Sequence, residues 1–267
     1  MKAMKIIALS LMVFGGVFPS CSSEQSASSA LRSMKPEKYF IIPAQVELAK
    51  AVIKQDLQGI DAAIAKGANV NKVGKEEMTP LAWAFSKQKK ASFQRLLEKG
   101  ANPNFKTKKV AWNNDGRSVM QFAALAEDPD YLKLVLKYGG NPNAPSKARG
   151  RTIIYTSIKN HRTQNIKTLV EFGADINHQD EAGFTPIMAA KSLTKYDLVF
   201  LLMNLGADLS KRHHLITANG DKKNGGKTLA ESIQHMGDRS IRVLGLEKEQ
   251  REWYNKVIAE LKSRGLL

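Results

Sequence analysis

The hydrophobic positions of this chain recur in blocks that each fit a helix–loop–helix unit. Between Ala174 and Asp208, a polar turn precedes Thr185-Pro186 and an apolar run, and a second apolar run, Leu198 to Leu205, ends at Gly206. A threonine followed by proline is a helix start signal, and its hydroxyl can cap free backbone N–H groups. Glycine is a common helix stop. Two helices this short cannot bury their own apolar faces, so each unit needs neighbours.

The same start and stop signals recur along the chain. Successive closing glycines are 33 to 39 residues apart, and the distance from opener to glycine is 21 residues in four consecutive units. Counting back seven, four and three from each glycine gives apolar residues, which share one helical face. The pattern predicts an all-α repeat array. Its openers are Thr79, Ser118, Thr152, Thr185 and Thr228, and its glycines are Gly67, Gly100, Gly139, Gly173 and Gly206.

These units resemble ankyrin repeats. The residues that carry the resemblance are Thr-Pro-Leu-Ala-Trp-Ala (79–84), Thr-Pro-Ile-Met-Ala-Ala (185–190) and the Gly-Ala-Asn/Asp-x-Asn endings at 67–71, 100–104 and 173–177. The resemblance covers roughly residues 43 to 245 and implies an all-α ankyrin-repeat solenoid of about six helix–loop–helix repeats. The histidine that the family places third after the threonine is missing, which removes a hydrogen bond between loop and helix. Its place is taken by Ala82, Gln121, Tyr155 and Met188.

Residues 1–20 predict a signal peptide. Two lysines precede an apolar run from Ile6 to Phe18, which is short for a transmembrane helix and typical of the apolar part of a secretory signal. The single cysteine, Cys21, follows directly. This arrangement resembles a bacterial lipoprotein signal, in which the cysteine is lipidated, although Phe18 and Pro19 depart from that pattern. Ser22 then favours, by the same resemblance, the inner leaflet of the outer membrane. The alternative is an ordinary secretory signal cut within residues 26–30.

The remaining sequence divides into a tether and a repeat domain. Residues 21–42 are rich in serine, which favours a flexible, lipid-anchored tether, and residues 43–267 form the predicted ankyrin domain. A C-terminal capping helix is expected from Leu246 to Leu261. One cysteine excludes a disulfide within the chain, so stability must come from packing. The free protein is expected to be monomeric.

Two loops carry insertions relative to the others, and insertions in repeat arrays are often found on the binding face. They lie at residues 105–116 and 210–227. Trp112 lies among lysines, which suits an interface hot spot. Packing of Trp112 onto its own loop is an equally good explanation. The predicted partner-binding residues, from these loops and the repeat between them, are Lys106, Lys108, Lys109, Trp112, Asn113, Arg149, Arg151, Lys211, Arg212, His213 and His214.

The charge balance bears on the partner. The chain has 41 Lys and Arg against 25 Asp and Glu, and removing the two signal lysines leaves a net charge of +14. This indicates an anionic partner. The export signal excludes cytosolic nucleic acid, which leaves an acidic protein, anionic lipid or lipopolysaccharide, or charge that serves solubility alone.

The sequence does not favour an enzyme. It has no Gly-x-Ser-x-Gly elbow, no second cysteine and no His-Glu-x-x-His motif, and the glycine-rich stretch 220–228 misses phosphate-loop spacing by one residue. We therefore expect no catalytic residues, no metal and no cofactor.

The chain further resembles periplasmic ankyrin-repeat lipoproteins that act as immunity proteins against type VI secretion lipase effectors. The shared features are the lipobox-like Cys21, the serine-rich tether and the basic array. The resemblance implies that the chain binds a toxic phospholipase, with an acidic surface, and blocks its active site. Two alternatives stay open: an envelope adaptor that binds anionic lipid or lipopolysaccharide, and an accessory chaperone of an exported enzyme.

Overall fold

The computed structural model describes residues 35–108, 117–146, 149–216, 222–223, 225–235 and 245–267. It contains two compact units, residues 1–141 and 142–267. The predicted signal peptide, Cys21, most of the tether, Lys109, Trp112 and Asn113 lie outside the described residues. Within the part of the chain that is described, no helix combines the length and the apolar character needed to cross a bilayer.

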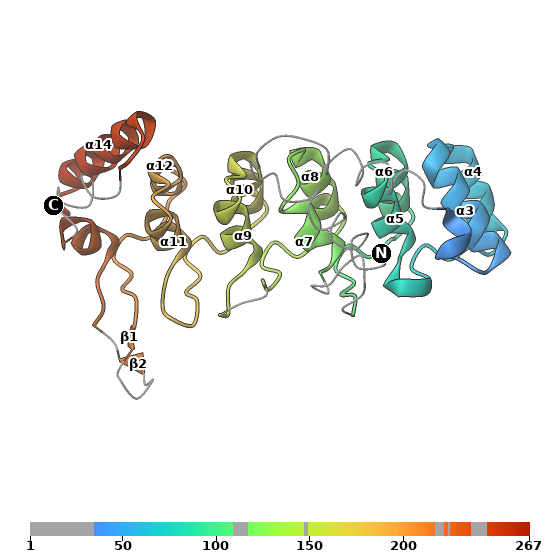
Figure 1. The fold of residues 1–267 in the computed structure, drawn as a ribbon, viewed down its shortest axis with the longest axis horizontal. Coiled ribbons are helices and arrows are strands. Elements are labelled where there is room, and N and C mark those ends of the chain that lie inside the picture. The colour runs from blue at the N-terminus through green and yellow to red at the C-terminus, as the bar shows by residue number, and fades with distance from the viewer. Residues whose placement is uncertain (1–34, 109–116, 147–148, 217–221, 224, 236–244) are drawn as a thin grey trace. The chain divides into compact units, whose positions relative to one another are not determined.

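Each unit consists of helix pairs in chain order (Figure 1). Unit 1 contains η2 (Pro36–Lys38), α3 (Pro43–Lys54), α4 (Leu57–Ala65), η3 (Lys75–Glu77), α5 (Pro80–Ser86), α6 (Lys90–Glu98), α7 (Val119–Ala123) and α8 (Pro129–Lys137). Unit 2 contains α9 (Ile153–Lys159), α10 (Thr163–Glu171), α11 (Pro186–Ser192), α12 (Tyr196–Asn204), β1 (Leu215–Ile216), β2 (Lys222–Lys223), helical residues 229–235 and α14 (Lys248–Ser263). The predicted all-α solenoid is confirmed. Among the described residues, the one sheet is the antiparallel pair β1–β2.

Packing begins before the predicted start of the array at residue 43. Tyr39 and Phe40 follow η2 and are 1% and 2% exposed. Their rings lie 5.6 and 6.1 Å from the Trp83 ring of α5. The predicted tether therefore ends earlier, because two aromatic side chains from its last residues cover the first repeats.

At the other end, α14 packs against α12, in the same way that α6 packs against α4 and α8 against α6. The predicted C-terminal helix is present and takes the position of the second helix of a sixth repeat. Its buried residues are Tyr254, Val257 and Leu261. Trp253 is half-buried at the edge of this face, with its ring 5.6 Å from that of Phe200.

The predicted helix signals are met in part. All five closing glycines have positive φ, between 84° and 94°, as a left-handed helix end requires. Thr79 accepts a hydrogen bond from the backbone N–H of Ala82, and Ser118 forms a capping box with Gln121. Thr185 makes no such bond, and its buried hydroxyl has no partner among the described residues. The prediction that its hydroxyl caps α11 is wrong, so Pro186 alone marks that helix start.

The asparagine endings connect each repeat to the next. Asn71 Nδ2 donates to the Gly100 carbonyl at 2.9 Å, and Asn71 Oδ1 accepts from the Asn102 N–H at 2.7 Å. Asn104 makes the same two bonds to Gly139 and Asn141. In unit 2, Asn143 makes them to Gly173 and Asp175, and Asn177 accepts from Asp208. This asparagine ladder fixes the spacing of neighbouring repeats within each unit.

One strained position predicts a stabilising substitution. Thr194, between α11 and α12, has a φ of 54°, a left-handed conformation in which a β-branched residue is an outlier. Such strain costs about 1–3 kcal/mol, and glycine removes it while adding about 0.5–1 kcal/mol of unfolded-state entropy. We expect Thr194→Gly to raise the free energy of unfolding by roughly 1 kcal/mol in urea denaturation.

The matched control is Thr168→Gly within α10, where the backbone is helical. There glycine is expected to lower the free energy of unfolding by roughly 0.5 kcal/mol. Destabilisation of equal size in both variants would show that Thr194 is not strained.

Candidate functional site

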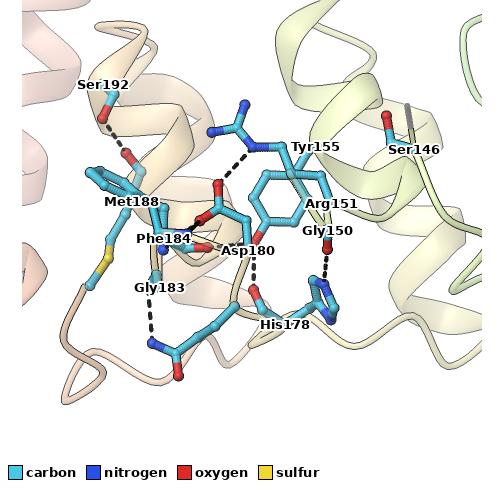
Figure 2. Close-up of polar contacts among 12 residues, drawn as sticks. Ser146, Gly150, Arg151, Tyr155, His178, Asp180, Gly183, Phe184, Met188 and Ser192 are labelled. Carbon is cyan, nitrogen blue, oxygen red and sulfur yellow. Dashed lines mark hydrogen bonds and ion pairs between the residues drawn. The ribbon is translucent and has the colours of Figure 1, made fainter. Parts of the chain in front are cut away.

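The loop that precedes α11 is organised around a buried carboxylate. Asp180 is 3% exposed, and its Oδ1 accepts hydrogen bonds from the N–H groups of Ala182 and Phe184, both at 2.9 Å. The Asp180 N–H donates to the Phe184 carbonyl at 3.0 Å. One side chain thus closes the turn from residue 180 to residue 184 (Figure 2).

Two side chains from the preceding repeat hold this loop. Arg151 Nε donates to Asp180 Oδ2 at 2.8 Å. The Tyr155 hydroxyl of α9 lies 2.5 Å from the carbonyl oxygen of His178 and 2.6 Å from that of Phe184 (Figure 2). Burial, reinforced by the negative charge of Asp180, raises the Tyr155 pKa well above its usual range, so the hydroxyl stays a donor. Tyr155 occupies the position of the missing family histidine and restores a bond between helix and loop.

The backbone just before α9, at residues 149 and 150, also binds the loop that precedes α11. The His178 ring Nε2 lies 2.6 Å from the Gly150 carbonyl oxygen, and the Glu181 N–H donates to the Arg149 carbonyl at 2.8 Å. Arg149 itself has a φ of 59°, and its side chain is exposed. Of the predicted binding residues, Arg149 is therefore fixed through its backbone and presents its guanidinium to solvent.

The next loop along the chain attaches to the first. The His214 N–H donates to the Ala182 carbonyl at 2.8 Å, and Gln179 Nε2 donates to the Arg212 carbonyl at 2.9 Å. The His213 ring stacks on Phe184, with centroids 5.0 Å apart and planes 16° from parallel. Loops of successive repeats in unit 2 therefore form one hydrogen-bonded cluster on the side to which β1–β2 project (Figure 1).

The predicted binding cations differ in whether their charges contact a carboxylate or solvent. Arg212 makes two bonds to the Glu231 carboxylate, at 2.8 and 2.5 Å, and this contact lowers the Glu231 pKa. Lys211 lies 3.9 Å from Asp208. Lys106 and Lys108, in unit 1, are exposed. Arg151 and Arg212 hold the loops through ion pairs, whereas Lys106 and Lys108 point their charge to solvent.

Sequence reasoning missed the acidic partners of these cations. Asp180 lies 29 residues from Arg151, and Glu231 lies 19 residues from Arg212. Thr228 and Glu231 follow the Ser/Thr-x-x-Glu pattern of a capping box, and both of its hydrogen bonds are present. That pattern was the available signal for Glu231. Within the described ranges, no three His, Cys, Asp or Glu side chains are placed to hold a metal ion.

A small pocket lies beside the loop cluster in unit 2, between α11 and helical residues 229–235. Its volume is about 190 Å³. The sequence did not single it out, because its walls come from residues more than forty positions apart. It is lined by Phe184, Met188, Lys191, Ser192, His213, Leu229 and Ser232.

Comparison with known proteins agrees with this architecture. The family model for ankyrin repeats in three copies matches residues 48–146 and 120–213. Protein PhlB of Serratia liquefaciens is 28% identical over 194 residues, which cover 73% of this chain and 79% of that protein. Putative ankyrin repeat protein L371 of Acanthamoeba polyphaga mimivirus is 31% identical over 130 residues, 48% of this chain.

The match to L371 and one further match each cover only a minor part of the relative. The match to L371 covers 16% of that protein, and the match to protein phosphatase 1 regulatory subunit 27 of Homo sapiens, 37% identical over 59 residues, covers 22% of this chain and 38% of the relative. No catalytic family is indicated, and ankyrin repeats are protein-interaction modules. The chain belongs to the ankyrin-repeat family.

Proposed function

We propose that this chain is an exported, lipid-anchored immunity protein that binds and neutralises a toxic phospholipase of the type VI secretion class. The observation that carries the proposal is the order of its parts: a protein-binding ankyrin array follows an export-type N-terminus that ends beside the lone Cys21. An anchor in the outer membrane would hold the inhibitor beside the phospholipids that it protects. Tethering of this kind raises the local concentration of a binder without any new contact.

The charge distribution supports an acidic-surfaced partner. Lys106 and Lys108 are exposed in a loop that carries an insertion, and Arg149 is exposed in unit 2. Exposed cations of this kind accelerate association with an anionic surface, and the acceleration decreases as salt is added.

The direct test is inhibition. The full chain with a C-terminal tag, purified in detergent, is titrated into a type VI phospholipase effector, and fatty-acid release from phospholipid vesicles is measured. We expect activity to fall to background at one equivalent. A rise in activity would favour the accessory chaperone, and binding to vesicles alone, reversed by salt, would favour the envelope adaptor. Either result would overturn the proposal.

The predicted contact is tested by charge reversal. We expect Lys106→Glu with Lys108→Glu to weaken phospholipase binding at least tenfold in low salt, mostly through a slower association rate, because rim charges act on encounter. Lys133→Glu with Lys137→Glu on α8 makes the same charge change at exposed lysines and is expected to change affinity less than threefold. Equal weakening in both variants would assign the effect to net charge.

Lipidation is tested at Cys21. We expect the wild-type chain to incorporate labelled palmitate and to fractionate with membranes, and Cys21→Ser to lose both properties, because the thiol is the group to which the diacylglyceryl lipid is attached. Ser23→Ala is the matched control and should behave as wild type. Recovery of unlabelled wild-type protein, cut within residues 26–30, would show that the signal is an ordinary secretory one.

A further inference from the structure

The pocket between α11 and helical residues 229–235 combines an apolar floor with a cation. Met188 and Leu229 form the floor and are 4% and 0% exposed. Phe184, with His213 stacked on it, forms one wall. Lys191, Ser192 and Ser232 complete the lining, and Lys191 Nζ donates to the Ser232 carbonyl at 3.3 Å.

Lys191 has no counter-ion within the described part of the chain. No carboxylate there lies within ion-pair distance of its ammonium group. Burial, and then the positive charge of Lys227, lowers the pKa of Lys191. Glu231, next to Ser232 in sequence, is already bound by both terminal nitrogens of Arg212. The pocket therefore contains a half-buried positive charge that lacks the compensation buried charges normally have.

The volume limits what can enter. Clefts that bind drug-sized molecules measure about 300–1,000 Å³, whereas this pocket measures about 190 Å³. It matches the size of one side chain. Interfaces between proteins commonly centre on single side chains inserted into such desolvated pockets.

We infer that this pocket is the anchor site for one acidic side chain of the protein partner. The partner's carboxylate would lie against Lys191 Nζ, and its methylene groups would pack on Met188 and Leu229. An ammonium ion that is poorly solvated and unpaired gains more from a carboxylate than an exposed lysine does, because the desolvation cost is already met in the free protein. The inference rests on the proposed function only in requiring a protein partner.

The test uses a probe rather than the partner. The full chain, labelled with ¹³C at methionine methyl groups, is titrated with N-acetylglutamate N-methylamide, and the Met188 methyl resonance, assigned with Met188→Leu, is followed by NMR. We expect a saturable shift with a dissociation constant on the order of 1–10 mM. The glutamine analogue, which is isosteric and neutral, should bind at least tenfold more weakly.

Two variants make the test specific. Lys191→Met should raise the dissociation constant of the glutamate probe at least tenfold. Lys87→Met, at the end of α5 in unit 1, removes another half-buried lysine, whose pKa burial lowers to about 8, and should leave the response unchanged. Equal binding of the two probes, an unchanged response in Lys191→Met, or equally tight binding of inorganic phosphate would overturn the inference.

The two proposals fail separately. If the chain inhibits no phospholipase but the glutamate probe still shifts Met188 in a Lys191-dependent way, the immunity function is overturned and the pocket assignment is supported. If inhibition is observed and the probe does not bind, the pocket assignment is overturned and the immunity function is supported.

Discussion

Replacing Trp83 by alanine is expected to lower the free energy of unfolding by about 3–5 kcal/mol, the range for removing a buried large aromatic side chain. Trp83 is 0% exposed and contacts Tyr39 and Phe40, which precede the first helix pair. Its Nε1 donates to the Ala49 carbonyl of α3 at 3.2 Å. Its loss leaves a cavity and removes the Trp83–Ala49 hydrogen bond at the interface between the first two repeats.

Because repeat arrays are stabilised by nearest-neighbour contacts, this loss should be local. Hydrogen exchange in the Trp83→Ala variant is expected to accelerate over η2, α3 and α4, with α9 to α12 unchanged, and urea denaturation should show an early transition. Trp83→Phe retains most of the ring contacts but not the Nε1 bond, and should cost less than Trp83→Ala. A single late transition in Trp83→Ala would contradict the assignment of Trp83 as the side chain that holds the N-terminal segment.

Replacing Asp180 by alanine is expected to cost about 3–5 kcal/mol, the range for breaking a buried ion pair by removal of one partner. Two backbone N–H groups, of Ala182 and Phe184, lose their acceptor, and the Arg151 guanidinium loses its counter-ion. The two part-buried donors, at about 1–3 kcal/mol each when left unsatisfied, account for part of this cost, and Arg151, whose side chain is 33% exposed, recovers some solvation from water. The loop at residues 178–184, which is bonded to Tyr155 of α9 and to the backbone of His214, should then lose its fixed shape.

Asp180→Asn is the informative control for this variant. The amide oxygen can still accept from Ala182 and Phe184, but the charge opposite Arg151 is removed, so we expect a smaller loss of roughly 1–3 kcal/mol. Hydrogen exchange should increase at residues 178–184 and 212–214 in Asp180→Ala and much less in Asp180→Asn. Unit 1 should be unaffected in both. Unchanged exchange in the loop would show that Asp180 does not organise it.

The repeat architecture could be predicted because its signals are local. An opener, a closing glycine and the apolar positions between them lie within 21 residues of one another, and each reports on one helix pair. The segment around Tyr39 was assigned to the tether for the opposite reason. Its η2 turn is three residues long, and its burial depends on Trp83, more than forty residues away.

The loop cluster shows why the candidate site was only partly accessible from sequence. Arg151 and Arg212 could be recognised as cations in loops, but whether a loop cation faces a partner or an internal carboxylate depends on spatial neighbours. Asp180 and Glu231 provide those carboxylates from the following loop and from the start of the next helix. Lys191 was hidden for a similar reason, since it lies in a regular helix and only the position of Ser232 makes it part of a pocket.

The asparagine ladder has a consequence for how this protein can evolve. The loop that contains Lys106 and Lys108 begins just after Asn104, which is bonded to the next repeat, and ends at Ser118, whose capping box starts α7. Both ends are therefore fixed by contacts that do not involve the residues between them. Substitutions at the exposed Lys106 and Lys108 are therefore expected to leave these end contacts intact, so the charge that this loop presents can change while the repeats on either side stay constant.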